Sequence, residues 1–183
     1  MPDQISMQTP RLLIKPLLLR NVSAVTRLAG HPLIADTTLL IPYPYLPSHA
    51  RRFILASRRS RSKGREAVFG IFHKRQDLLL GIIGLTIDGA HHTAEMGYWV
   101  GVPYWGKGYA TEAARRIVRH GFEDLNLHKV WARYFKRNPA SGRVLQKLGF
   151  HCEGCQRRHV LKNGRHEDVV LCGILQEEWK KEK

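Results

Sequence analysis

Residues 105–112 (WGKGYATE) place two glycines between a short apolar run and a stretch with helical periodicity. Glycine lets the backbone turn sharply and approach a ligand closely. A helix that begins directly after such a turn presents unpaired N–H groups and the positive end of its dipole, and both favour an anion. The segment therefore predicts a strand–turn–helix unit that holds phosphate.

The residues on both sides of this turn have matching periodicities. The preceding run, residues 98–102 (YWVGV), is short and apolar, which is typical of a buried strand. After the turn, apolar or small side chains recur at i, i+3, i+4 and i+7, the pattern of a helix with one buried face. That stripe consists of Ala110, Ala113, Ala114, Ile117, Val118, Gly121 and Phe122. Its small first residues allow the helix to lie close to a sheet.

Turn and cap signals divide the rest of the chain. Asn163-Gly164 favours a hairpin, and Pro139 and Gly149 mark the start and end of a helix. Strands are expected at residues 11–15, 67–73, 78–87, 94–102, 128–135, 150–160 and 167–175, and helices at 21–28, 48–60, 110–122 and 139–149. The predicted fold class is α/β (α+β), with a mixed, mostly antiparallel sheet of about seven strands and about four helices.

The length of 183 residues suits one domain, so residues 1–183 are expected to fold as a single unit. No run approaches the roughly 18 apolar residues that a membrane helix needs. The N-terminus lacks a basic start followed by an apolar stretch, and three cysteines do not suggest a disulfide framework. A cytoplasmic protein without membrane contact is therefore expected.

The charge of the chain is strongly basic. Thirty Lys and Arg residues against fifteen Asp and Glu give a formal net charge of +15 and a pI near 10.2. Such a field attracts polyanions, including nucleotide cofactors, RNA and anionic membrane surfaces. A solvated, arginine-rich surface without a polyanionic partner is the alternative, and composition does not choose between them.

Several motifs together resemble one enzyme family. Residues 106–113, after the 94–102 strand, are similar to the acetyl-coenzyme A loop of the GNAT acetyltransferases, with the pattern Gln/Arg-x-x-Gly-x-Gly/Ala. Gly108 and Ala110 fit this pattern, whereas Trp105 stands in the Gln/Arg position. Residues 138–141 (NPAS), 144–150 (VLQKLGF), 9–12 (TPRL) and 175–179 resemble the RimJ/RimL-like branch, the N-terminal acetyltransferases of ribosomal proteins. The similarity covers nearly the whole chain in the right order.

The resemblance implies a GNAT fold with acetyl-CoA as co-substrate and no metal. Strands 94–102 and 128–135 are then parallel neighbours that splay apart, and the pantetheine arm of the cofactor lies in the gap. The residues implied to contact the cofactor are Tyr98, Val100, Val102, Trp105, Gly106, Lys107, Gly108, Tyr109, Ala110, Thr111, Asn138 and Ser141. Lys107 either adds a charge or points to solvent, and Asn138 also suits a plain helix N-cap because Pro139 follows it.

The implied reaction needs a neutral amine. At pH 7 an α-amine with a pKa near 7.8 is about 14% neutral, and a lysine near 10.4 only about 0.04%. A general base, or a water chain to one, therefore helps either acceptor. Glu95 is the first candidate and Glu66 the second, although a salt-bridged sheet residue explains Glu95 equally well. Ser141 is expected to donate a hydrogen bond to the departing thiolate, and the alternative is a plain polar residue in the first turn of a helix.

The remaining groups around the reacting centre have weaker assignments. A backbone N–H near Val100 is expected to stabilise the tetrahedral intermediate. Tyr98 and Tyr134 either orient the substrate or pack in the core. The Cys-x-x-Cys at Cys152 and Cys155 has no second pair and lies on a predicted strand, where positions three apart face opposite sides, so no metal site is expected there.

The sequence does not identify the acceptor of the acetyl group. The resemblance places the substrate at residues 28–47 and the helix that follows, whose basic stretch Arg51–Arg65 is solvated surface, an anion site, or a dock for RNA including the ribosome. The favoured function is an N-acetyltransferase acting on a protein N-terminus of the ribosomal-protein type. A small-amine acetyltransferase and a non-catalytic acyl-CoA-binding or RNA-docking module are the alternatives. Either a monomer or a homodimer is compatible with the sequence.

Overall fold

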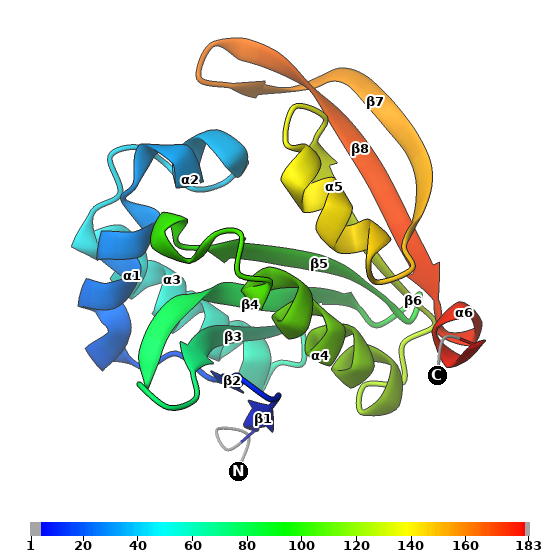
Figure 1. Ribbon diagram of the computed structural model, residues 1–183, viewed down its shortest axis with the longest axis horizontal. Coiled ribbons are helices and arrows are strands. Elements are labelled where there is room, and N and C mark those ends of the chain that lie inside the picture. Colours follow the sequence, from blue (N-terminus) through cyan, green and yellow to red (C-terminus); the bar gives the residue numbers. More distant parts are fainter. Residues whose placement is uncertain (1–4, 182–183) are drawn as a thin grey trace.

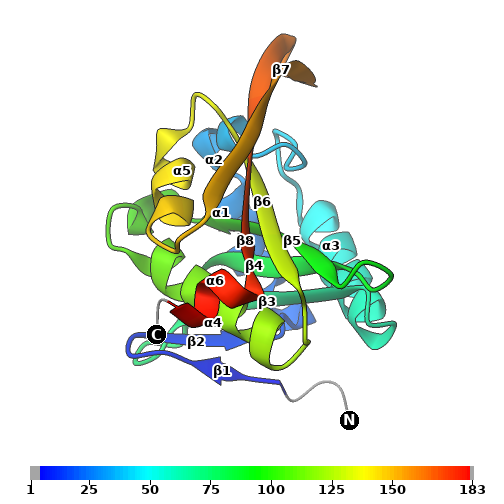
Figure 2. The ribbon, with the colours of Figure 1, turned by 90° about the vertical axis from the view of Figure 1, so that its right-hand side faces the viewer.

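A computed structural model describes residues 5–181 (Figures 1 and 2). Eight strands form one sheet in the order β1-β2-β3-β4-β5-β6-β8-β7. They are β1 Met7–Gln8, β2 Leu12–Lys15, β3 Glu66–His73, β4 Leu78–Asp88, β5 Thr93–Val100, β6 Lys129–Phe135, β7 His151–Lys162 and β8 Arg165–Leu175. Neighbouring strands are antiparallel except β5 and β6, which are parallel.

Helices cover both faces of this sheet (Figure 2). They are α1 Val22–Ala29, α2 Pro32–Thr37, α3 Pro47–Ser62, α4 Tyr109–Glu123, α5 Pro139–Gln146 and α6 Gln176–Lys181, with short 3-10 turns at Leu19–Asn21 and Val102–Tyr104. The α4 stripe buries Ile117 and Val118 against Met96 of β5 on one face. On the other face, Val25 of α1 and Ile54 of α3 form a second core with Ile82 of β4.

The β7–β8 hairpin extends beyond the rest of the sheet, and its far end lies beside α2 (Figure 1). Register shifts occur on β7 between Cys152 and Gly154 and again between Gln156 and Val160. Such irregularities bend a strand and increase its local twist. The turn of the hairpin contains Asn163 and Gly164, both with positive φ, as the Asn-Gly signal predicts.

The fold class and the splayed parallel pair are confirmed, and the differences are local. β1, α2 and α6 were not expected because each has at most six residues, too few to show a periodicity. The helix predicted to start at residue 48 begins one residue earlier, at Pro47, and Leu46 rather than Ser48 is its N-cap; the Nδ1 atom of His49 accepts the Leu46 N–H at 3.1 Å. Within residues 5–181, no helix combines the length and apolar character needed to cross a membrane.

The strand predicted over residues 94–102 ends earlier than expected. β5 stops at Val100, and Val102 begins the 3-10 turn Val102–Tyr104. Pro103 explains this ending, because proline cannot donate a hydrogen bond to a neighbouring strand. Val102, which the resemblance placed in the strand beside the cofactor, therefore lies in a turn instead.

Candidate active site

The glycine turn forms the predicted start of α4. Gly106 and Gly108 have φ of 74° and 77°, a left-handed conformation that side chains disfavour. Gly108 occupies the N-cap position, so no side chain satisfies the first-turn N–H groups of α4. These amides, with the dipole of a 15-residue helix behind them, form a site suited to a phosphate group.

The N-terminal segment braces this turn from outside. The hydroxyl of Thr9 and the backbone N–H of Arg11 donate to Oε1 of Glu112 at 2.6 and 2.9 Å. The Nε atom of Arg11 donates to the other carboxylate oxygen at 2.7 Å, and its Nη1 atom donates to the Lys107 carbonyl at 3.0 Å. Partial burial alone would raise the pKa of Glu112, but these hydrogen bonds and the guanidinium charge outweigh it and lower the pKa. The residues that suggested only a family likeness at positions 9–12 thus hold the glycine turn in place.

The gap between β5 and β6 opens directly beside this turn. The two strands pair only from Thr93 to Glu95 with Lys129 to Trp131, and beyond this point they diverge. A cavity of about 710 Å³ runs through the gap. The Gly101 N–H donates to Leu80 of β4, so by alternation the amides of Tyr98 and Val100 face the widening gap.

Trp105 lies at the open edge of this gap. Its indole Nε1–H donates to the Val100 carbonyl at 2.5 Å, and the ring lines the cavity. Trp105, which the sequence placed only in the phosphate loop, therefore also bonds to a carbonyl of the splayed strand β5. Trp105 thus bonds to the Val100 carbonyl but not to the Val100 amide.

The α5 end of the cavity brings Tyr98, Asn138 and Ser141 together. The hydroxyls of Tyr98 and Ser141 lie 2.8 Å apart. Burial raises the pKa of Tyr98 to about 12, so the phenol stays protonated at neutral pH. The Oδ1 atom of Asn138 accepts the Ser141 N–H at 3.4 Å and caps α5, the plain structural role expected for it. Asn138 and Ser141 both line the cavity as well.

Three strands present an acidic row on the opposite face of the sheet. Glu66, Thr86 and Glu95 are aligned across β3, β4 and β5. In the next row, Gly84 lies beside Gly97, and a Cβ added at Gly97 would meet nothing within 4 Å. Val68 packs against Gly84, so the open space beside the acids lies at Gly97, where a substrate group can approach the strand backbone.

The two acids of this row have different environments. The Nε and Nη2 atoms of Arg133 donate to the two carboxylate oxygens of Glu95 at 2.7 and 3.5 Å, so Glu95 is in an ion pair. Among residues 5–181, the Glu66 carboxylate makes no side-chain hydrogen bond or ion pair, and burial raises its pKa. Arg133 was missed from the sequence, although an arginine between apolar strand residues Ala132 and Tyr134 was the available signal.

The structure brings most of the predicted residues to one cavity. Its lining includes Glu66, Glu95, Tyr98, Val100, Trp105, Gly106, Gly108, Tyr109, Ala110, Thr111, Tyr134, Asn138 and Ser141. Val102 and Lys107 do not line it; the Lys107 ammonium lies 5.9 Å from the Tyr104 ring centre. Across the described residues, no three His, Cys, Asp or Glu side chains are grouped as a metal site requires.

The segment after α2 also lines the cavity. The wall includes Thr38, Leu39 and Ile41, as the expected substrate region at residues 28–47 implies. The sequence did not show what holds this segment in place. That support comes from residues about 100 or more positions away in the chain, and no local pattern indicates such contacts.

A parallel strand pair that splays beside a glycine-turn helix is the architecture of an acyl-CoA-dependent N-acetyltransferase. The family model described as the acetyltransferase (GNAT) domain matches residues 11–151. This match covers more than half of the chain, and the chain belongs to the GNAT family of acetyltransferases.

Individual relatives agree with this assignment. The chain is 44% identical over 115 residues to Probable N-acetyltransferase YjcK of Bacillus subtilis (strain 168), covering 62% of this chain and 64% of that protein. It is 29% identical over 119 residues to [Ribosomal protein uS5]-alanine N-acetyltransferase of Escherichia coli (strain K12), covering 64% and 61%. The solved structure of RimL, a ribosomal L7/L12 alpha-N-protein acetyltransferase with coenzyme A, has the same fold, with a TM-score of 0.87 at 18% identity over 93% of this chain and 98% of that chain. The chain thus spans less than two thirds of the length of the first two relatives.

Proposed function

We propose that this protein transfers the acetyl group of acetyl-CoA to a primary amine, and that the acceptor is the N-terminal α-amine of a protein of the ribosomal type. The observation that carries the proposal is one continuous cavity with two different ends. An anion site at the start of α4 lies at one end, the acidic row on β3 to β5 lies at the other, and the β5–β6 gap joins them.

The proposed cofactor contacts run from the start of α4, through the β5–β6 gap, to the start of α5. The amides of residues 106–111 hold the pyrophosphate, whereas the Trp105 N–H already donates to the Val102 carbonyl. The gap-facing backbone of β5 at Tyr98 and Val100 pairs with the acyl-pantetheine arm, whose thioester oxygen accepts a hydrogen bond from the Val100 N–H. Asn138 and Ser141 lie at the thioester end. Lys107 contributes its backbone, because its carbonyl is held by Arg11 and its side chain lies outside the cavity lining. Val102 supports the turn rather than the ligand.

The acceptor nitrogen attacks the thioester carbon directly in a ternary complex. The new C–N bond forms, the C–S bond breaks, the amine loses a proton, and the thiolate takes one up. The Val100 N–H, which faces the gap, stabilises the oxyanion of the tetrahedral intermediate. Ser141 donates a hydrogen bond to the leaving sulfur, and Tyr98, which keeps its proton because of its high pKa, donates to the Ser141 hydroxyl.

Glu95 is our first candidate for the group that takes the amine proton, directly or through one water. It lies in the last paired row before the strands diverge, and this is the carboxylate position closest to the gap. Glu66 is the second candidate, supported by the burial that raises its pKa and by its free carboxylate. A residue with a raised pKa is the stronger proton acceptor.

A panel of amines with acetyl-CoA, read by thiol release and product mass spectrometry, tests the function. Peptides that begin with Ala or Ser represent protein N-termini, and spermidine and an aminoglycoside represent small amines. The proposal expects the peptides to have the highest kcat/KM. Turnover only on a small amine would show that the acceptor is a small amine and not a protein N-terminus. A thermal shift with acetyl-CoA but no turnover on any amine would identify a non-catalytic acyl-CoA-binding module.

Helix α3 supports a docking contact with RNA on the ribosome. Its exposed cations include Arg51, Arg52, Arg59 and Lys63, whereas Arg61 is partly buried with its guanidinium 4.6 Å from the Phe69 ring centre. Such a contact would bring a basic enzyme to basic ribosomal proteins. RNA affinity should fall steeply as salt rises, and replacing Arg51 and Arg52 with Gln should flatten that dependence. An affinity independent of salt would contradict the electrostatic contact.

A further inference from the structure

The cavity wall at residues 36–41 has no strand partner in the sheet, yet it occupies one defined position. It begins in the last turn of α2, leaves the helix at Thr38, which is extended, and bends at Leu39 and Leu40. Leu39 and Ile41 line the cavity, together with Ile34 from inside α2. Backbone hydrogen bonds of a sheet do not explain its position, so side chains from other elements must hold it.

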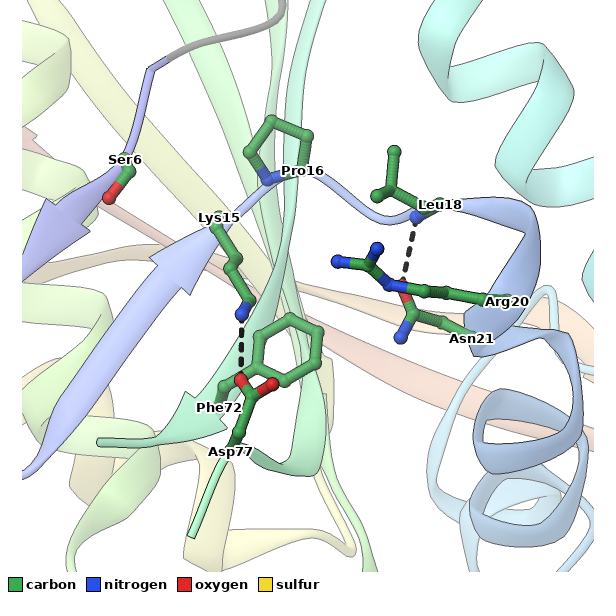
Figure 3. Close-up of a pocket in the computed structure, with 8 residues that line it drawn as sticks. All are labelled: Ser6, Lys15, Pro16, Leu18, Arg20, Asn21, Phe72 and Asp77. Atoms are coloured by element: carbon green, nitrogen blue, oxygen red, sulfur yellow. Dashed lines mark hydrogen bonds and ion pairs between the residues drawn. The ribbon is translucent and has the colours of Figure 1, made fainter. Parts of the chain in front are cut away.

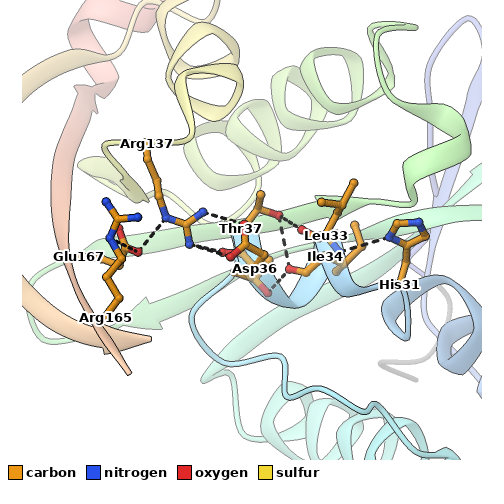
Figure 4. Close-up of polar contacts among 9 residues, drawn as sticks. His31, Leu33, Ile34, Asp36, Thr37, Arg137, Arg165 and Glu167 are labelled. Atoms are coloured by element: carbon orange, nitrogen blue, oxygen red, sulfur yellow. Dashed lines mark hydrogen bonds and ion pairs between the residues drawn. The ribbon is translucent and has the colours of Figure 1, made fainter. Parts of the chain in front are cut away.

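Arg137 provides the first tether. Its Nη1 atom donates to Oδ2 of Asp36 at 2.8 Å, and its Nη2 atom donates to the Asp36 carbonyl at 2.7 Å. Its Nε atom donates at 2.8 Å to Glu167, whose residue is 5% exposed. Figure 4 shows Arg137 lying between α2 and β8 in this arrangement. A guanidinium bonded on two edges fixes the geometry of both partners, because its donors are coplanar.

Lys162 provides the second tether. The residue is only 8% exposed, and its Nζ atom donates to the carbonyls of Leu39 and Ile41 at 3.2 and 2.9 Å. Burial lowers the pKa of Lys162, and the two carbonyls compensate part of the cost of burying its charge. Both tethers come from the end of β6 or from the β7–β8 hairpin, so the hairpin positions the wall.

The surface that this wall presents is mainly apolar: Thr37 and Thr38 also line the cavity, but their hydroxyls donate to backbone carbonyls of α2. Phe53, Val160 and Val169 complete it around Leu39 and Ile41. Among the charged residues that line the cavity, Arg143 and Lys147 belong to α5 and its end, and Glu95 is paired with Arg133. Only Glu66 then remains at this end, within the described lining, to receive a positive charge. A second ammonium or a carboxylate beside the reacting amine would be buried without a partner.

We infer that Arg137 and Lys162 are positioning residues that hold residues 36–41 as a fixed apolar wall, and that this wall selects a primary amine whose neighbouring side chain is apolar and uncharged. The inference rests on the proposed function and narrows it to one class of N-terminus. It excludes polyamines and peptides that begin with a charged residue as preferred acceptors.

Matched peptides that differ only in their first residue test the selection. The wild-type protein should favour Ala, Val or Leu over Lys or Asp in kcat/KM. Lys162→Met should raise the acceptor KM about tenfold, because two hydrogen bonds to a charged donor are lost, and leave the acetyl-CoA KM within about twofold. Lys162→Arg, which keeps a charged donor, should bring the acceptor KM most of the way back to the wild-type value. Preference for a Lys-first peptide or spermidine, or an unchanged acceptor KM in Lys162→Met, would overturn the inference.

A surface ion pair outside the cavity provides the control. Lys15 donates to Asp77 at 2.7 Å beside a separate hollow of about 250 Å³ (Figure 3). Lys15→Met should change neither KM. Hydrogen exchange of the amides of Asp36 and Thr37, which lie in the last turn of α2 beside the tethered segment, needs no turnover: Lys162→Met should lower their protection and Lys15→Met should not. If no amine is acetylated, the proposed function fails, but the exchange experiment still shows whether Lys162 holds residues 36–41 in place. Equal protection in the wild type and Lys162→Met would show that it does not.

Discussion

The two halves of the cavity are built by different kinds of contact. The cofactor half contains the glycine turn, the first turn of α4 and the Asn138–Ser141 corner, each formed by residues adjacent in sequence. The acceptor half is assembled from β3, β5 and α2, and its tethers join residues such as Asp36 and Arg137, 101 positions apart. Conformational demands of short segments set the first half, and Thr9 and Arg11 only brace its turn from about 100 positions away, whereas the position of the α2 segment in the second half depends on long-range side-chain pairs. The donor of a group-transfer enzyme is therefore easier to infer than its acceptor.

The largest expected effect is at the acidic row. Glu95→Gln should lower kcat at pH 7 by about 10²- to 10⁴-fold, because the variant cannot take a proton from the amine. The acetyl-CoA Kd, measured by calorimetry, should not change, because Glu95 lies on the acceptor face. The pH–rate profile distinguishes the two candidates: loss of the acidic limb in Glu66→Gln, with the limb intact in Glu95→Gln, would transfer the role to Glu66.

A substitution in the glycine turn should affect only the cofactor half. Gly108→Ala forces a side chain into φ of 77° and costs about 1–2 kcal/mol, so the acetyl-CoA Kd should rise about tenfold. The acceptor KM at saturating acetyl-CoA should stay the same. Gly89→Ala is the matched control, because Gly89 is an exposed loop glycine without positive φ and with open space around it. Equal effects of the two substitutions would rule out a special role for the turn.

This difference explains which features the sequence could predict. Gly106 and Gly108 indicate a left-handed turn because glycine tolerates positive φ, and the apolar stripe of α4 indicates its buried face. Both features were predicted correctly. Asn138 with Pro139 likewise announced a cap. The Glu95–Arg133 pair depends on the register of two strands, and the tethers from Arg137 and Lys162 depend on the bend of a hairpin. None of these leaves a periodic pattern, and α2 was too short to show one.

Glu112 tests how the cofactor half is stabilised. Its lowered pKa means that the folded state holds the carboxylate more strongly than the unfolded state. This contribution is present above the unfolded pKa near 4.5 and is lost as the pH falls through the lowered folded value. Glu112→Gln should therefore destabilise the protein by about 1–2 kcal/mol at pH 7, and by less near pH 3. Urea titrations at both pH values measure this, with the exposed Glu177→Gln as the control.

Glu66 in the acceptor half predicts the opposite sign and the smallest effect. Burial raises its pKa, so the folded state binds the proton more strongly than the unfolded state does. The carboxylate then costs stability as the pH rises from about 4.5 through the raised folded value. Glu66→Gln should be more stable than the wild type at pH 7 by about 0.5 kcal/mol, a small amount because the group is partly solvated, and equal to it near pH 4.

The same Glu66→Gln variant should acetylate more slowly, whether Glu66 takes the proton or only attracts the ammonium. A gain in stability with a loss of rate is typical of a charge kept for function in an apolar site. A Glu66→Gln protein that is less stable at pH 7 would show that Glu66 supports the fold, and the acceptor half would then resemble the cofactor half at Glu112. Urea titration and the amine assay on one preparation decide between these two outcomes.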